Sequence, residues 1–557
     1  MVKPLKNKSS NKRIVSKGIK KTGDALPKDQ FWGLEKFLEK NQSIIILIFL
    51  FVSLIFSFFL FDIKISEGGD DSYYIQRAWF FIKRNEFPFY QGPIYPFVLA
   101  IPIYFFGINL IVLKLTSVIF TLGTLWFTYL SFRKRIPYIV LFSLIFFLSA
   151  NSYIQYYASQ TYSEAFFLFL QAFVLYLIIK LIDLIAVTDS APVKKIEYKN
   201  ILLVGFGLML MSLSKDIAII CIFSVVLFFL AYRKYKQGLF IFISFITWKV
   251  LAEVLIRIFY IGGSSHVQQM LLKDYYKPEL GYETFTGMID RFFANVEHFL
   301  SVSLPKLCHF RESAASQSIT FLAIVLSLTL IAIAIFAYKR NKYIFFALTY
   351  AIILFCGVCV GLPANLVQDR HILIALPLIY MALIYGLYQV TIKSSSVLRF
   401  YFLCFMLIFF AFNLFNSIED STRNFKVLQK NIKGDIYYGF TEDWVNFLRM
   451  STYCADSLPP SSFIASRKAS MSFIYGKGKE FYPVFVVFSN NADTVLTTFK
   501  KDKVTHVIMA SLRQNPKINN GQTINTLQRL FYPLRDRLTL VKQIGENEPA
   551  YLYKINY

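Results

Sequence analysis

The chain has 557 residues, of which 56% are apolar, 18% are aromatic and only 17% are charged. Its mean hydropathy of +0.49 is too high for a protein that faces water on all sides. The charged fraction is also low, since a soluble domain is about 25% charged. The net charge of +25 is spread over short basic clusters between apolar runs, as in the cytoplasmic loops of membrane proteins, so no nucleic-acid partner is expected. The composition excludes a soluble enzyme, a disordered chain and a fibrous protein, and predicts a helical protein embedded in membrane lipids.

The N-terminal third sets the predicted topology. Residues 1–42 are basic and are predicted to be cytoplasmic, and the apolar run 43–61 begins too late to be a cleavable signal peptide. Because a bilayer core of about 30 Å needs about 20 helical residues, the predicted fold is an all-α polytopic membrane bundle of about 11 transmembrane helices within residues 43–415. The ten runs after the first are 108–132, 136–153, 163–187, 200–214, 216–232, 238–258, 319–338, 343–362, 371–392 and 398–415.

Two segments are ambiguous in length, and the positions of the basic clusters resolve both. Residues 93–106 are short and contain three prolines; only if they lie in the outer interface do all later basic clusters fall inside. Residues 200–232 have basic clusters on both sides and must cross twice, with a recessed turn at Lys215. The N-terminus is then cytoplasmic, and the loops 62–107 and 259–318 lie outside, the second long enough to form a lid.

The tail, residues 416–557, loses the long apolar runs and is predicted to be a soluble extracytoplasmic α/β domain. Helical patterns occur at Glu442–Cys454 and Thr523–Leu534. Strands that alternate with helices indicate such a domain. The strand-like runs are 463–466, 485–488, 504–510, 538–544 and 550–555.

Ionisable groups gather in the predicted outer loops, and the first loop carries the strongest candidate. Asp70 and Asp71 follow two glycines in the segment EGGDDSYY. The pair is consistent with a helix N-terminus that complements the helix dipole. Alternatively, one carboxylate is a general base for an acceptor hydroxyl or amine. The neighbouring Tyr73 and Tyr74 are predicted to contact substrate.

Later outer segments add an acid and several cations. Glu164 opens the run 163–187 directly after Tyr162; it is either a helix-start acid or a group that acts beside Asp70, with Tyr162 as a further substrate contact. Lys215 is either a snorkelling lysine or a phosphate contact. Arg370 belongs to a salt-bridged loop or binds phosphate bidentately, and His371 flanks it.

The order of these motifs resembles that of the GT-C glycosyltransferases, in the branch that contains protein O-mannosyltransferases and the lipid A aminoarabinose transferase. The resemblance covers residues 44–392 and is tightest at 67–107. The motifs are GGDDSYYIQRA, QGPIYPFVLAIPIYFFG, ASQTYSE, LSKD and RHILIALP.

This resemblance implies a cavity on the non-cytoplasmic face, a polyprenyl-phosphate sugar donor and a lipid, glycan or protein acceptor. Asp70 or Asp71 is then catalytic together with Glu164, and Lys215 and Arg370, flanked by His371, bind the donor phosphate. The basic residue that the family carries before its Gly-Pro segment is Gln91 here, so that phosphate contact is missing or moved. No metal or other cofactor is expected, although a divalent cation is compatible with the acids.

The predicted function is a membrane glycosyltransferase, an integral protein of a bacterial inner membrane. Two alternatives remain open. A transporter or flippase for a lipid-linked or anionic solute predicts charges at mid-membrane and inverted repeats. A non-catalytic sensor predicts that the acidic pair tolerates neutralisation.

Overall fold

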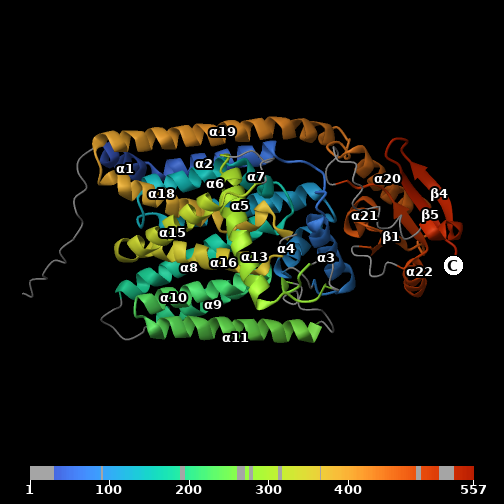
Figure 1. Cartoon of the computed structure of the whole chain (residues 1–557), viewed down its shortest axis with the longest axis horizontal. Coiled ribbons are helices and arrows are strands. Elements are labelled where there is room, and N and C mark those ends of the chain that lie inside the picture. Colours follow the sequence, from blue (N-terminus) through green and yellow to red (C-terminus); the bar gives the residue numbers. More distant parts are fainter. Residues whose placement is uncertain are drawn as a thin grey trace, which may run out of the picture.

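The protein is a helical bundle with a small mixed-sheet domain at one end (Figure 1). The computed structural model describes residues 30–88, 92–187, 195–259, 270–274, 280–310, 317–363, 366–484, 491–513 and 532–557. Most bundle helices lie roughly parallel to the long axis of the molecule, so that their ends form two opposite faces (Figure 1).

All eleven predicted apolar runs are helical. Their helices are α2 (Gln42–Phe59), α5 (Leu110–Phe132), α6 (Tyr138–Ala150), α7 (Ser152–Ala158), α8 (Ser163–Val187), α9 (Lys195–Ser214), η1 (Asp216–Ile220), α10 (Cys221–Ala231), α11 (Tyr235–Phe259), α15 (Thr320–Arg340), α16 (Lys342–Gly361), α17 (Asp369–Leu373), α18 (Leu376–Ile392) and α19 (Ser396–Ile432). Shorter helices connect them: α1 (Gln30–Lys40), α3 (Asp70–Arg84), α4 (Ile94–Phe106), α13 (Phe285–His298), η3 (Phe299–Ser303) and α14 (Leu304–Leu307).

Within the described residues, seven helices are long and apolar enough to cross a membrane, and α6 with α7, which bend by 60° at Asn151, make an eighth span if counted as one. The remaining predicted spans correspond to shorter apolar helices in α9, η1 with α10, and α18. The protein is therefore an integral membrane protein. Of its shorter apolar segments, α9 and η1 flank the turn at Lys215, and α18 follows the short helix α17 that carries Arg370. The proline-rich segment 93–106 forms the short helix α4, which packs against α3.

The basic turns meet at one end of the bundle. Asn341 donates a hydrogen bond to the carbonyl of Arg135 (2.9 Å), and Arg135 pairs with Asp183 at 2.5 Å. Glu35 of α1 accepts the backbone N–H groups that begin α6 at the same end. The C-terminal domain lies at the opposite end, next to α3 (Figure 1). This arrangement agrees with the alternation expected from the charge pattern, and the assignment of the basic end to the cytoplasm stays a prediction.

The C-terminal part folds as the predicted α/β unit. Its five-stranded sheet has the order β2-β1-β3-β5-β4, with β1 parallel to β2 and β3, and β5 antiparallel to β3 and β4. The helix α19 runs without a break past residue 416 and leads into this unit. The predicted strand 485–488 and most of the predicted helix 523–534 lie outside the described residues. The elements are α20 (Glu442–Ser457), β1 (Ile464–Ser466), α21 (Ala469–Tyr475), β2 (Phe481–Pro483), α22 (Ala492–Lys501), β3 (His506–Met509), η5 (Tyr532–Arg537), β4 (Leu538–Ile544) and β5 (Ala550–Ile555).

Candidate active site

Two glycines set the start of α3. Gly69 has a φ of +86°, which an L side chain adopts only with strain. A Cβ on Gly68 would lie 2.7 Å from the Tyr162 hydroxyl oxygen. Only a residue without a side chain therefore lets this turn approach the loop before α8 so closely. The chain reverses here, and the acidic pair occupies the first turn of α3, where carboxylates complement the helix dipole.

Asp70 points out of this turn toward the loop that carries Arg370. Its carboxylate pairs with the Arg370 guanidinium at 2.6 Å, and the two side chains remain 33% and 19% exposed. Burial alone would lower the pKa of Arg370, but the negative charges of Asp70 and Glu164 raise it, so the guanidinium stays charged. The structure thus brings together the first-loop acid and the distant arginine, both of which the sequence analysis named as candidate site residues.

Asp71 is turned the other way and is fully buried. Its carboxylate accepts hydrogen bonds from the Ser66 backbone N–H (2.8 Å), the Ser66 hydroxyl (3.0 Å) and the Ser72 backbone N–H (2.8 Å). Burial raises the pKa of Asp71 to about 6, against the lowering effect of the Ser66 hydrogen bond and of Lys114. Asp71 therefore stabilises the turn, whereas Asp70 is the acid of the pair that is partly exposed to solvent.

Glu164 and Lys215 form a second ion pair near the first. The Lys215 ammonium lies 3.1 Å from the Glu164 carboxylate, which is buried. Gly92 of the Gly-Pro segment lies against the Ser214 carbonyl beside this turn, so closely that a Cβ there would overlap it. The Gly-Pro segment and the Lys215 turn are therefore in contact. This contact agrees with the prediction that both motifs lie on the same side of the membrane.

The Arg370 loop is itself held by charges. Asp369 accepts hydrogen bonds from the Ser303 hydroxyl (2.6 Å) and the Lys306 ammonium (2.5 Å). The His371 ring accepts the Gln368 backbone N–H through Nδ1 (3.3 Å), which caps α17. This contact is the structural use of His371, and a phosphate contact by His371 remains a prediction.

The three tyrosines singled out in the sequence have different surroundings. The Tyr162 ring faces the Arg370 guanidinium at 5.4 Å, and its hydroxyl contacts the Ser66 hydroxyl at 2.5 Å. Tyr74 is buried and its hydroxyl contacts Ser163 at 3.4 Å. Tyr73 accepts a hydrogen bond from Arg77 (2.8 Å) one turn further along α3. Of these three tyrosines, Tyr162 is the one whose ring contacts Arg370.

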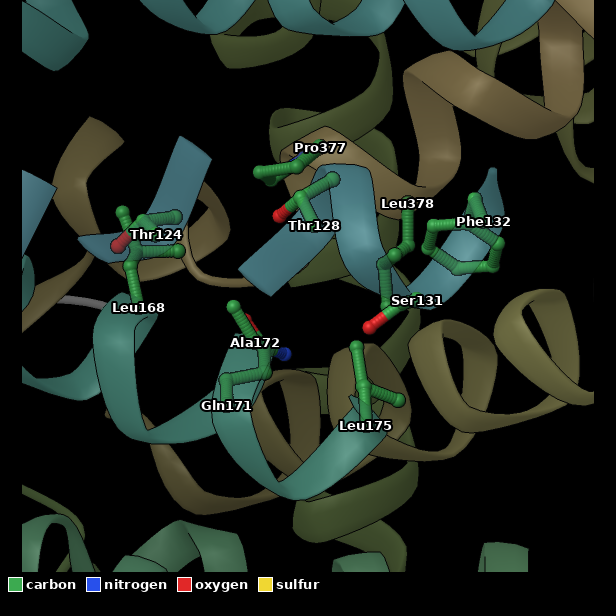
Figure 2. Close-up of a pocket in the computed structure, with 10 residues that line it drawn as sticks. All are labelled: Thr124, Thr128, Ser131, Phe132, Leu168, Gln171, Ala172, Leu175, Pro377 and Leu378. Carbon is green, nitrogen blue, oxygen red and sulfur yellow. The ribbon is translucent and has the colours of Figure 1, made fainter. Parts of the chain in front are cut away.

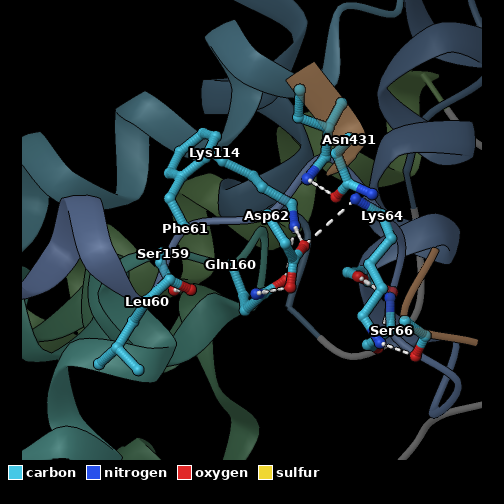
Figure 3. Close-up of polar contacts among 12 residues, drawn as sticks. Leu60, Phe61, Asp62, Lys64, Ser66, Lys114, Ser159, Gln160 and Asn431 are labelled. Carbon is cyan, nitrogen blue, oxygen red and sulfur yellow. Dashed lines mark hydrogen bonds and ion pairs between the residues drawn. The ribbon is translucent and has the colours of Figure 1, made fainter. Parts of the chain in front are cut away.

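A buried ion pair beneath the site was not singled out from the sequence. Lys114 of α5 pairs with Asp62 at 2.5 Å, with side chains 0% and 4% exposed, and both bind the side chain of Gln160 (Figure 3). A lone lysine in the apolar run 108–132 was the available signal, because a buried charge in such a run requires a partner. Lys468 of the C-terminal domain donates hydrogen bonds to the Glu67–Gly69 turn before α3. No pattern in the sequence indicated this contact.

A small pocket lies elsewhere in the bundle, between α5, α8 and the start of α18 (Figure 2). Its lining includes Thr124, Thr128 and Gln171 among apolar side chains, and it contains no ionisable group. None of the ionisable residues described above lines this pocket. Within the residues that the structure describes, no three His, Cys, Asp or Glu side chains converge as metal ligands, and independence of metals stays a prediction.

The sequence matches no protein-family model and no curated protein. Solved structures match by fold. ArnT from Cupriavidus metallidurans bound to undecaprenyl phosphate aligns with a TM-score of 0.52 and 11% identity, over 91% of this chain and 97% of that one.

The oligosaccharyltransferase of Archaeoglobus fulgidus aligns equally well. With a tethered acceptor peptide it gives a TM-score of 0.55 and 12% identity over 94% of this chain and 75% of that one. The archaeal oligosaccharyltransferase AglB from Archaeoglobus fulgidus, in complex with an inhibitory peptide and a dolichol-phosphate, gives a TM-score of 0.53 and 11% identity over 93% of this chain and 75% of that one. The predicted fold class is confirmed: the chain has the fold of the GT-C glycosyltransferases.

Proposed function

We propose that the protein is a membrane glycosyltransferase that transfers a sugar from a polyprenyl phosphate to an acceptor on the non-cytoplasmic face. The observation that carries this proposal is the ion pair of Asp70 with Arg370 beside that of Glu164 with Lys215. An acid for the acceptor and cations for a phosphate then lie side by side at one end of a bundle whose fold occurs in ArnT bound to undecaprenyl phosphate.

The cations suit the phosphate of a lipid-linked donor. Arg370 offers a planar fork of donors that binds phosphate bidentately, and Lys215 offers a point charge. Both lie at the end of the bundle, so the prenyl tail remains among the apolar helices while the phosphate meets the cations. In this proposal the incoming phosphate competes with Asp70 for Arg370, which releases the carboxylate for the acceptor.

The different burial of the two first-loop acids supports Asp70 as the general base. A base must be within hydrogen-bond reach of the proton that it takes, and the partial exposure of Asp70 leaves it accessible to an acceptor. Asp71 has its oxygens committed to Ser66 and Ser72 and is assigned to positioning.

The proposed step is a single displacement. The Asp70 carboxylate takes the proton of the acceptor hydroxyl or amine as the acceptor atom forms a bond to the anomeric carbon. The bond between this carbon and the phosphate oxygen breaks, and its electron pair leaves with the polyprenyl phosphate. Arg370 and Lys215 balance the charge that develops on the leaving phosphate. The reaction inverts the anomeric centre.

The test measures two properties of the purified protein: binding of undecaprenyl phosphate, and release of free polyprenyl phosphate from lipid-linked sugars in an extract of host membranes that also supplies the acceptor. Asp70→Asn is expected to lower the release rate about 10²- to 10⁴-fold, the usual contribution of a general base, and to leave binding intact. Arg370→Ala is expected to weaken binding as well, because it removes a phosphate ligand.

The matched control is Asp456→Asn, an acid on the surface of the C-terminal domain that is 48% exposed; both properties should equal those of the wild type. Full release activity in Asp70→Asn would refute the assignment of the base. Binding without any release from the wild-type protein, together with transport of the lipid across vesicles, would favour the flippase alternative.

A further inference from the structure

The C-terminal domain reaches into the candidate active site through one side chain. Lys468, in the residue before α21, donates hydrogen bonds from its ammonium to the backbone carbonyls of Glu67 (3.0 Å) and Gly68 (2.9 Å). A Cβ on Gly69 would lie 3.4 Å from the same Nζ atom. Lys468 thus holds the two peptide groups that immediately precede the start of α3.

This contact belongs to an interface that follows α3 over its whole length. The Ser72 and Ser470 hydroxyls meet at 2.8 Å at the beginning of α3, and the Phe80 and Phe473 rings pack 5.6 Å apart in its second half. At the far end, Arg84 pairs with Glu480 at 2.7 Å. The helix that starts with Asp70 is therefore seated on the C-terminal domain rather than on the bundle alone.

We infer that Lys468 is a positioning residue of the active site, which fixes the Glu67–Gly69 turn and thereby places Asp70 against Arg370 and the acceptor. This inference rests on the proposed function. The C-terminal domain then contributes to catalysis, because its Lys468 binds peptide carbonyls of the first outer loop.

The charges around Lys468 favour a role that depends on its protonation. Burial and the neighbouring Arg467 lower the pKa of Lys468 to about 8, while Asp70, Asp71 and Glu67 raise it. From α20, the Trp444 ring faces its ammonium at 5.9 Å. Above about pH 8 the side chain loses its charge, and a neutral amine is a weaker donor to the two carbonyls than an ammonium.

The experiment compares Lys468→Met and Lys468→Arg with Lys477→Met, a lysine of the same domain that is 67% exposed. Turnover, the KM for the donor and the melting temperature are measured from pH 6 to pH 10 in the full-length protein. Lys468→Met should lower turnover roughly 10- to 100-fold with little change in donor KM, since a misplacement of about 1 Å can cost about 100-fold in rate. Lys477→Met should behave as the wild type.

The pH profile separates positioning from mere structural support. The wild type should lose activity above about pH 8, whereas Lys468→Arg, which stays charged, should keep activity and lose this alkaline limb. The inference is overturned if Lys468→Met keeps full turnover, or if the limb is unchanged in Lys468→Arg. These outcomes are distinct from failure of the proposed function, in which the wild type releases no polyprenyl phosphate at any pH. If Lys468→Met does not fold, the profile of Lys468→Arg decides.

Discussion

Neighbouring residues of identical chemistry have different tasks in this site. Asp70 and Asp71 are adjacent carboxylates, but a helix directs consecutive side chains about 100° apart. Asp70 consequently faces Arg370, and Asp71 faces the interior of the turn and binds Ser66. The two glycines before them allow this geometry, one through its positive φ and one through the close approach of Tyr162.

The burial of Asp71 predicts an acidic limb in the pH dependence of transfer. The pKa of Asp71 is raised to about 6, so the carboxylate that accepts the Ser66 and Ser72 hydrogen bonds exists above that pH. Below it, protonation replaces an acceptor by a donor facing N–H groups, and the turn that positions Asp70 loosens.

Initial rates measured from pH 5 to pH 8 should therefore fall as the pH drops through about 6. Melting temperatures recorded over the same range serve as the control for unfolding. A rate that stays constant down to pH 5 would show that ionised Asp71 is not needed.

At the scale of elements, a buried ion pair joins the first outer loop to the bundle. Asp62 follows α2, Lys114 belongs to α5 and Gln160 precedes α8 (Figure 3). Asn431 near the end of α19 accepts the backbone N–H of Ile63 beside them (3.0 Å). The elements that carry Asp70 and Glu164 are thus tied at a common point beneath the site.

Removing one partner of this pair is expected to be costly. Lys114→Met leaves the Asp62 charge buried without its counter-ion and should lower the free energy of unfolding by about 3–5 kcal/mol. The double variant Lys114→Met/Asp62→Leu should recover much of this loss, because it removes both charges. Thermal unfolding in detergent provides the measurement.

The matched control is Lys477→Met, which breaks an exposed pair with Asp456 and should cost less than about 1 kcal/mol. Equal melting temperatures for Lys114→Met and the wild type would show that the Lys114–Asp62 pair contributes no stability.

At the scale of the whole molecule, the basic turns and the candidate active site lie at opposite ends of the bundle. The helix α1 lies at one end, and α3 and the C-terminal domain lie at the other (Figure 1). The basic turn at Arg135 contacts Asn341 at the α1 end, whereas Arg370 pairs with Asp70 at the start of α3. The positive-inside rule assigns the basic end to the cytoplasm. In this orientation the proposed sugar-transfer site faces the outer leaflet.

This orientation predicts the accessibility of single cysteines, introduced after the six native ones have been replaced. Asp456→Cys should react with a membrane-impermeant maleimide in intact cells, because it lies on the C-terminal domain. Arg340→Cys, at the basic end, should react only after the membrane is permeabilised. The reverse pattern would invert the topology and place the proposed site in the cytoplasm.

The sequence by itself determined the membrane class, the helical runs and the α/β character of the tail, because apolar length and strand–helix alternation are local properties of a chain. It also indicated the acids and cations at the outer loops, since basic clusters fix the parity of crossings. Only the tertiary structure decided that Asp70 rather than Asp71 meets Arg370, that Lys215 pairs with Glu164, and that Lys468 holds the first loop. These contacts join residues as distant as 67 and 468, and their geometry depends on packing between elements that no local pattern encodes.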